Sequence, residues 1–210
     1  MARLRLHMLL CLTTLTAVAV AQLHLAWAAP PVPGAPLPLV GGGEQPDWAG
    51  TVWTWWWVGE ALRTGVSPFT ASANFLPVGQ GPVAWFNLVD AFTFAPLIHL
   101  LGPRVGYNAS SAVVLVTSGL GAAVFARRLG ARWGAATVVG LAVQTSAFVT
   151  TELLQGRPGQ AWVALPMLAF AALAQLVEQR TRRRVVIAGL LVAAVGYTYW
   201  FYGLFLGIAV

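Results

Sequence analysis

The sequence predicts an all-α, polytopic membrane protein, and two observations lead to that class. Residues of the set AVILMFWYC fill 58% of the 210 positions, and charged residues fill only 9%. A soluble domain carries about 25% charged residues, so a chain with this little polar surface needs lipid as its solvent. In addition, several apolar runs approach or exceed the roughly 20 residues that a helix needs to cross a bilayer core of about 30 Å.

Five apolar runs are candidates for membrane-spanning helices, so we expect about five spans in a single membrane domain. The fourth run is short and contains Pro166, and the fifth is still apolar where the sequence ends at Val210. We therefore expect the chain to be the N-terminal portion of a longer protein. The five runs are residues 4–29, 105–126, 133–151, 161–177 and 185–210.

The twelve basic residues are all arginine, and their positions predict the orientation of the spans. If the five runs alternate in direction, only Arg63, Arg104 and Arg157 fall on one side of the membrane. The positive-inside rule places the other nine arginines in the cytoplasm, together with the N-terminus. The formal charge of +6 is then a topology signal, and we expect no nucleic-acid partner. The nine are Arg3, Arg5, Arg127, Arg128, Arg132, Arg180, Arg182, Arg183 and Arg184.

The first apolar run, residues 4–29, allows two interpretations. We favour an uncleaved anchor, because the run is long for a signal peptide. The alternative is a cleaved signal peptide, since Ala26-Trp27-Ala28 resembles an A-x-A cleavage site. In both cases residues 30–103 form a long first extracytoplasmic loop.

That loop is expected to hold two interfacial helices. The first, Trp48 to Leu62, contains five tryptophans, of which Trp53, Trp56 and Trp57 share one helical face. Tryptophan prefers the membrane interface, so we expect this face to be an interfacial anchor. The same face is also a candidate surface for stacking on sugars or contacting lipid, and the two roles are compatible. The second helix lies in residues 83–101.

Residues 83–101 are long enough to span the membrane, but a span there would reverse everything downstream and place both arginine clusters outside. The segment also contains Asn87, Asp90 and Pro96. We therefore expect a helix that lies in the outer interface or is re-entrant.

The order of short motifs in this chain resembles the GT-C glycosyltransferases, the polytopic membrane enzymes that use lipid-phosphate sugars. A single span leads into a long first loop, in which the acids Glu44-x-x-Asp47 precede tryptophans. Two turns follow, Gly65 to Phe69 and Leu76 to Gly79. The layout is most similar to the N-terminal part of large, poorly characterised bacterial proteins of that type, in which the loop acids are adjacent or form an E-x-D pair. The resemblance implies a bacterial inner-membrane protein.

The resemblance also implies transfer of a sugar from a polyprenyl-phosphate donor on the extracytoplasmic face. Such a reaction needs a carboxylate as general base, for which Asp47, Glu44 and Asp90 are the candidates in that order. Asp47 also fits the simpler role of a helix N-cap. The leaving phosphate needs a cation, for which Arg157 and Arg104 are candidates.

The expected partners are the lipid-linked donor and membrane lipids, and the oligomeric state stays open. Cys11 is the only cysteine, which excludes a cysteine cluster for metal or redox chemistry. No cofactor follows from the residues, and a divalent metal remains an open alternative.

A non-enzymatic membrane protein is the alternative function, either a transporter or a lipid-handling subunit. A transporter typically has ionisable residues at mid-membrane and an internal repeat. The second to fifth runs have no charge at mid-depth and no repeat, which argues against ion-coupled transport. A third interpretation is an inactive fragment, because the apolar run continues to Val210.

Overall fold

The computed structural model describes residues 2–28, 40, 47–71, 81–82 and 87–209. This part of the chain is almost entirely helical, which confirms the all-α class. The elements are α1 (Ala2–Ala28), α2 (Asp47–Thr64), β1 (Thr70–Ala71), β2 (Gly81–Pro82), α3 (Leu88–Arg128), α4 (Trp133–Gln144), α5 (Ala147–Leu154), α6 (Pro158–Ala161), α7 (Ala164–Glu178), α8 (Arg182–Thr198) and α9 (Trp200–Ala209). The two strands pair antiparallel, Thr70 with Pro82 and Ala71 with Gly81.

Four helical segments among the described residues are apolar and long enough to cross a membrane. This finding supports a polytopic membrane protein, with four such segments where the sequence predicted about five. The four are Arg5–His24, Leu88–Arg128, Trp133–Leu154 and Pro158–Glu178.

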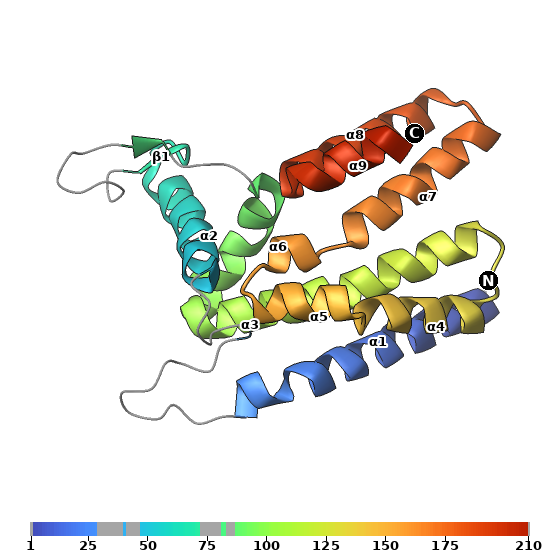
Figure 1. The fold of residues 1–210 in the computed structure, drawn as a ribbon, viewed down its shortest axis with the longest axis horizontal. Helices are drawn as coiled ribbons and strands as arrows, with labels where there is room; N and C mark the ends of the chain where they lie inside the picture. The colour runs from blue at the N-terminus through green and yellow to red at the C-terminus, as the bar shows by residue number, and fades with distance from the viewer. Residues whose placement is uncertain (1, 29–39, 41–46, 72–80, 83–86, 210) are drawn as a thin grey trace.

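The predicted fifth span, residues 185–210, differs in the structure because it divides into α8 and α9 at Tyr199. Tyr199 has an extended backbone, with φ −155° and ψ 111°. A Cβ added at Gly203 would lie 3.0 Å from the Cα of Gly196, so α9 folds back along α8 (Figure 1). Hydropathy could not predict this turn, because the helices before and after it are both apolar.

The predicted boundary near residue 102 is present as a sharp kink inside α3. Gly102 has φ 77° and ψ 162°, a conformation that glycine adopts without a Cβ clash. After the kink the chain packs on itself, since a Cβ at Gly106 would lie 2.5 Å from the carbonyl oxygen of Leu97. The half of α3 before Gly102 therefore lies across one end of the helix bundle, and the half after it runs along the bundle (Figure 1).

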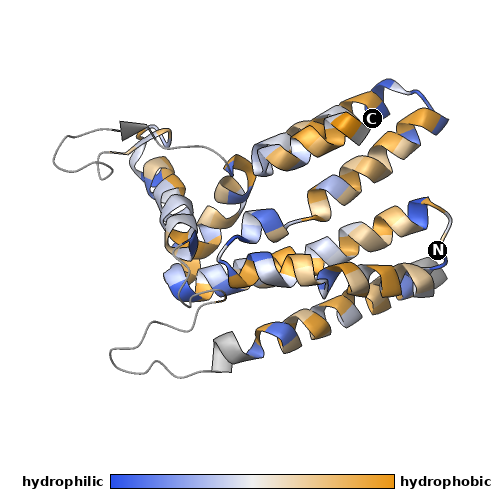
Figure 2. Ribbon diagram, viewed as in Figure 1, coloured by the Kyte–Doolittle hydropathy of each residue, from blue (hydrophilic) through white to orange (hydrophobic). Residues whose placement is uncertain are grey.

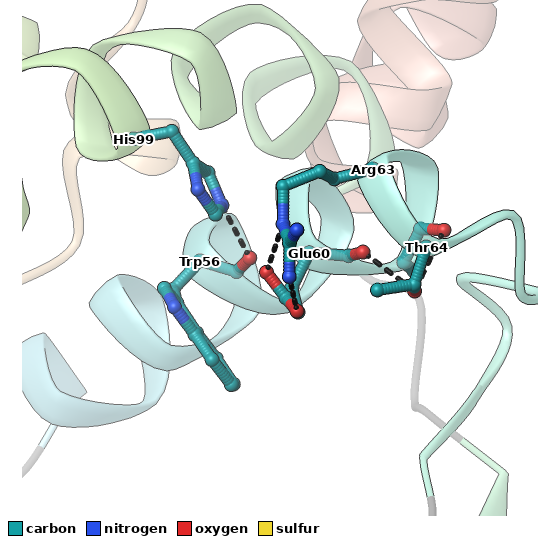
Figure 3. A network of polar contacts seen from close by, with 6 residues as sticks. Trp56, Glu60, Arg63, Thr64 and His99 are labelled. Carbon is teal, nitrogen blue, oxygen red and sulfur yellow. Dashed lines mark hydrogen bonds and ion pairs between the residues drawn. The ribbon is translucent and has the colours of Figure 1, made fainter.

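Helix α2 lies beside the first half of α3, and together they cover that end of the bundle (Figure 1). His99 Nε2 is 3.0 Å from the carbonyl oxygen of Trp56 (Figure 3). Its ring also packs against Gly59, where a Cβ would collide with it. One turn further along α2, Glu60 accepts two hydrogen bonds from Arg63 (Figure 3). His99 is thus a packing residue between the two helices.

The opposite end of the bundle carries the arginine clusters. The N-terminus of α1, the α3–α4 turn and the α7–α8 turn all lie there, and the last two appear as hydrophilic ends on otherwise apolar helices (Figures 1 and 2). The described segments therefore alternate in direction, which is the arrangement assumed when the arginine pattern was interpreted. Which end faces the cytoplasm stays a prediction.

Close backbone contacts and a few polar side chains hold the long helices together. A Cβ at Gly140 of α4 would lie 2.6 Å from the carbonyl oxygen of Gly119 of α3, so the two helices touch through glycine. Gln144, which is buried, donates from Nε2 to the carbonyl oxygen of Leu15 at 3.0 Å and to Gln22 Oε1 at 3.3 Å. Gln22 is thus a helix-packing contact, as expected for a polar residue inside an apolar helix.

Candidate functional site

The first residue of α2 meets the turn between α5 and α6 at an ion pair. Arg157 Nε donates to Asp47 Oδ2 at 2.5 Å, across a sequence separation of 110 residues. Both side chains keep contact with solvent, with exposed fractions of 38% for Arg157 and 42% for Asp47. The pair is therefore formed but remains within reach of a ligand.

This ion pair lies in the wall of a cavity of about 650 Å³. Carboxylate, guanidinium, amide and hydroxyl groups share the lining with aromatic rings. The lining residues are Asp47, Gly50, Thr51, Thr54, Trp55, Asn87, Arg157, Gln160, Tyr199, Trp200 and Phe201. Asp47 and Arg157, two of the residues that the sequence singled out, are thus brought together in one cavity.

The position of Arg157 follows from the tight turn that precedes it. Gly156 has φ 78°, in the left-handed region that favours glycine. A Cβ at this position would collide with the backbone of Trp48, so the turn packs directly on the first turn of α2. Thr51 Oγ1 donates to the carbonyl oxygen of Gly156 at 3.0 Å and fixes the two segments to each other.

Arg157 has further polar neighbours on its own segment. Its Nη1 donates to Gln155 Oε1 at 2.8 Å and lies 3.9 Å from Glu152 Oε2. The hydrogen bond to Asp47, followed by the charges of Asp47 and Glu152, raises the pKa of Arg157 above its usual value. The guanidinium is therefore a permanent positive charge at the cavity wall.

Asp47 occupies a position in which two roles coincide. As the first residue of α2 it places a negative charge at the positive end of the helix dipole. Its carboxylate also lines the cavity and binds Arg157. Glu44, the second candidate acid, lies outside the described residues.

Asp90, the third candidate acid, lies behind the cavity wall. It is fully buried, and its Oδ2 accepts a hydrogen bond from Trp55 Nε1 at 3.3 Å. A Cβ at Gly159 would lie 2.6 Å from the same oxygen, so Asp90 also packs on α6. The ring of Trp55 is tilted between Phe94 and Tyr107, with centroids 5.0 and 5.6 Å apart. Asp90 thus holds Trp55, a lining residue that the sequence did not single out for the site.

The tryptophans that the sequence grouped on one face lie elsewhere. Trp53 and Trp57 stack on each other, with centroids 6.2 Å apart. Trp57 is buried against Ala61 and Ala71, and its Nε1 donates to the carbonyl oxygen of Pro68 at 3.0 Å. Trp56 is 38% exposed.

These three tryptophans and Arg104 are not among the residues that line the cavity. Two of the three, Trp53 and Trp57, do stack on one face and pack against Ala71 of β1, whereas Trp56 remains partly exposed. Arg104 follows the kink of α3 and belongs to the start of its second half.

The corner between α8 and α9 forms a further part of the cavity wall. Tyr199, Trp200 and Phe201 come from this corner, and the Trp200 and Phe201 rings stack with centroids 3.7 Å apart. Tyr202 donates from its hydroxyl to the carbonyl oxygen of Gln160, which attaches α9 to α6. The aromatic run was visible in the sequence, but its place in the site depends on the turn at Tyr199.

Within the described residues, no group of three or more histidine, cysteine, aspartate or glutamate side chains is arranged to hold a metal ion. The chain matches no known protein-family model, no curated protein and no solved structure.

Proposed function

We propose that the protein transfers a sugar from a polyprenyl-phosphate donor to a hydroxyl acceptor, at the end of the bundle covered by α2 and on the extracytoplasmic face of the membrane. The observation that carries the proposal is the pairing of Asp47 with Arg157 in the wall of an accessible cavity. A carboxylate and a guanidinium are the two groups that this reaction needs side by side.

In the proposed reaction, an acceptor hydroxyl oxygen attacks the anomeric carbon of the donor. The bond between that carbon and the phosphate oxygen breaks, and the polyprenyl phosphate leaves with the bonding electrons. Asp47 takes the hydroxyl proton, while Arg157 offsets the charge on the leaving phosphate. The negative carboxylate thus acts on a proton, and the positive guanidinium acts on an anion.

The contact between Asp47 and Arg157 suggests an order of binding. While Asp47 Oδ2 accepts the hydrogen bond from Arg157, that oxygen is occupied and does not face an acceptor hydroxyl. A donor phosphate that binds Arg157 competes with Asp47 for the same donor groups, and it releases the carboxylate towards the acceptor. Donor binding would therefore precede activation of the acceptor.

The remaining lining of the cavity suits a carbohydrate. Asn87, Gln160 and the threonines Thr51 and Thr54 offer donors and acceptors for sugar hydroxyls. The stacked pair Trp200 and Phe201 offers an apolar surface for the C–H face of a sugar ring. A site of this mixed character fits a donor whose head is polar and whose tail is lipid.

Lipid handling without chemistry is the second candidate function, because a cavity with one arginine would also hold the phosphate of a carrier lipid. The two functions differ in their need for Asp47 as a base. A lipid-handling protein would bind a polyprenyl-phosphate hexose and leave it intact. A transferase would consume it.

The test uses the protein expressed from its complete gene in membranes, with a polyprenyl-phosphate hexose as the probe and release of polyprenyl phosphate as the readout. Asp47→Asn keeps a residue suited to a helix start and an acceptor for Arg157, but it cannot act as a base. We expect release to fall by about 10²–10⁴-fold while expression stays level, the usual cost of losing general-base assistance. Glu60→Gln, an acid of the same helix outside the cavity, is the matched control. Near-normal release in Asp47→Asn would reject Asp47 as the base.

A further inference from the structure

A second cavity, of about 400 Å³, lies at the arginine end of the bundle between α3, α7 and α8. Its walls combine two kinds of surface. Val124, Leu168, Ala172 and Leu191 make an apolar part, and a polar part consists of Arg127, Arg128 and Gln175. This cavity is far from Asp47 along the bundle, so nothing in the proposed sugar transfer accounts for it.

The polar part of this cavity carries an excess of positive charge. Arg128 pairs with Glu178, and Arg127 donates to the carbonyl oxygen of Ala131. Arg184 does not line the cavity, but its Nη1 donates to the carbonyl oxygen of the lining residue Gln175 at 3.0 Å. Three arginines against one glutamate leave a formal charge of +2 around the cavity.

Arg128 also has a donor that the protein does not use. Its Nε is buried and has no hydrogen-bond partner among the described residues. A buried donor without a partner is unfavourable, and buried polar groups in proteins are nearly always bonded. A rotation of the Arg128 side chain towards the cavity would offer this donor to an anionic oxygen bound there.

We infer that this cavity binds an anionic phospholipid, with the phosphate at Arg127 and Arg128 and an acyl chain against the apolar wall. Guanidinium groups are well matched to phosphate oxygens, and basic pockets between transmembrane helices suit anionic headgroups. The apolar wall separates a lipid from free phosphate, which would gain nothing from Leu168 or Leu191. The location also fits, since the arginines lie at the ends of apolar helices, where headgroups lie.

The experiment is native mass spectrometry of the full protein, delipidated in a neutral detergent and then titrated with phosphatidylglycerol or phosphatidylcholine. We expect one phosphatidylglycerol to bind preferentially. Arg128→Gln should weaken this binding roughly tenfold, the effect of removing one charge-assisted contact. Arg183→Gln is the matched control, because Arg183 is an exposed arginine at the same end that does not line the cavity, and it should bind like the wild type.

A second variant tests the apolar wall without changing charge. Ala172→Phe adds volume inside the cavity and should also weaken phosphatidylglycerol binding, while Ala172→Ser, which adds little volume, should not. Thermal unfolding of each variant checks that the fold is kept, and Arg127→Gln replaces Arg128→Gln if the latter does not fold.

Three results would overturn the inference. Equal losses in Arg183→Gln and Arg128→Gln would indicate diffuse attraction to the arginine end. Unchanged phosphatidylglycerol binding by a folded Ala172→Phe variant would exclude this cavity as the binding site. Displacement of the phospholipid by millimolar inorganic phosphate would indicate a free-anion site.

Discussion

Trp55 of α2 donates its indole N–H to a carboxylate oxygen of Asp90, a fully buried acid on the first half of α3. The two residues join the helices that cover the end of the bundle. Trp55 faces the cavity and Asp90 lies behind it, so the acid acts on the site through the tryptophan. This relationship separates a positioning role from a catalytic one, and the two roles predict different outcomes for the same substitutions.

We predict that Asp90→Asn keeps polyprenyl-phosphate release within a few-fold of the wild type, because an amide oxygen still accepts from Trp55. Asp90→Ala should lower the melting temperature, since it leaves the indole N–H buried without a partner, at a cost of about 1–3 kcal/mol. Thermal unfolding in detergent and the release assay check the two effects. Loss of release in a stable Asp90→Asn protein would instead identify Asp90 as a catalytic group.

The packing of Gly156 on Trp48 gives a second prediction. Gly156→Ala requires both a left-handed backbone with a side chain and a shift of the Trp48 backbone. Gly65→Ala is the matched control, because Gly65 has φ 71° with nothing near its missing Cβ. The control should cost about 1–2 kcal/mol, the penalty of the left-handed conformation alone.

Gly156→Ala should cost more than this control and should also reduce activity, because the Arg157 turn must move away from α2. Melting temperatures of the two variants check the difference in stability. Equal shifts would mean that the contact with Trp48 is not tight.

The sequence predicted those features of the fold that depend on a short stretch of residues. Apolar length located four segments that are long enough to cross a membrane, where about five were predicted. The predicted boundary after residue 101 coincides with the kink of α3 at Gly102. The arginine clusters lie at one end of the bundle, as an alternating arrangement of the apolar runs requires. The turn at Tyr199 was not predicted, because residues 185–210 are predominantly apolar and hydropathy does not change where the chain reverses.

The candidate site was only partly predictable for a related reason. Asp47 and Arg157 could be selected by their chemistry, but their pairing depends on how α2 lies across the bundle. Likewise, periodicity grouped Trp53 with Trp57, yet it could not tell which face of α2 packs against β1 and which borders the cavity. Trp55 could therefore be assigned to the cavity wall only from the structure, in which Asp90 and α6 lie next to it.

A third prediction concerns orientation in the membrane. In a Cys11→Ser background, single cysteines at Ser67 and Thr181, both exposed and at opposite ends of the bundle, should react differently with a membrane-impermeant maleimide. We expect Ser67→Cys to label in intact cells and Thr181→Cys only after permeabilisation, because the arginine-rich end should face the cytoplasm. The opposite pattern would place the cavity of Asp47 on the cytoplasmic side and reject a donor presented on the outer face.

The last prediction separates the stability of the ion pair between Asp47 and Arg157 from its function. Partly exposed ion pairs typically contribute about 0–1 kcal/mol to stability. With exposed fractions of 38% and 42%, this pair belongs to that class. Arg157→Gln should therefore change the melting temperature little, by no more than about 4 °C for a chain of this size.

If Arg157 instead serves to bind the donor phosphate, Arg157→Gln should weaken donor binding by at least about tenfold, since a charge-assisted contact is lost. Arg157→Lys keeps the charge but loses the planar fork, and it should fall between Arg157→Gln and the wild type. Arg63→Gln removes an arginine that pairs with Glu60 outside the cavity, so it should bind the donor like the wild type. Equal donor affinity in Arg157→Gln and the wild type, with a large loss of stability, would show that the pair is structural and that the phosphate is bound elsewhere.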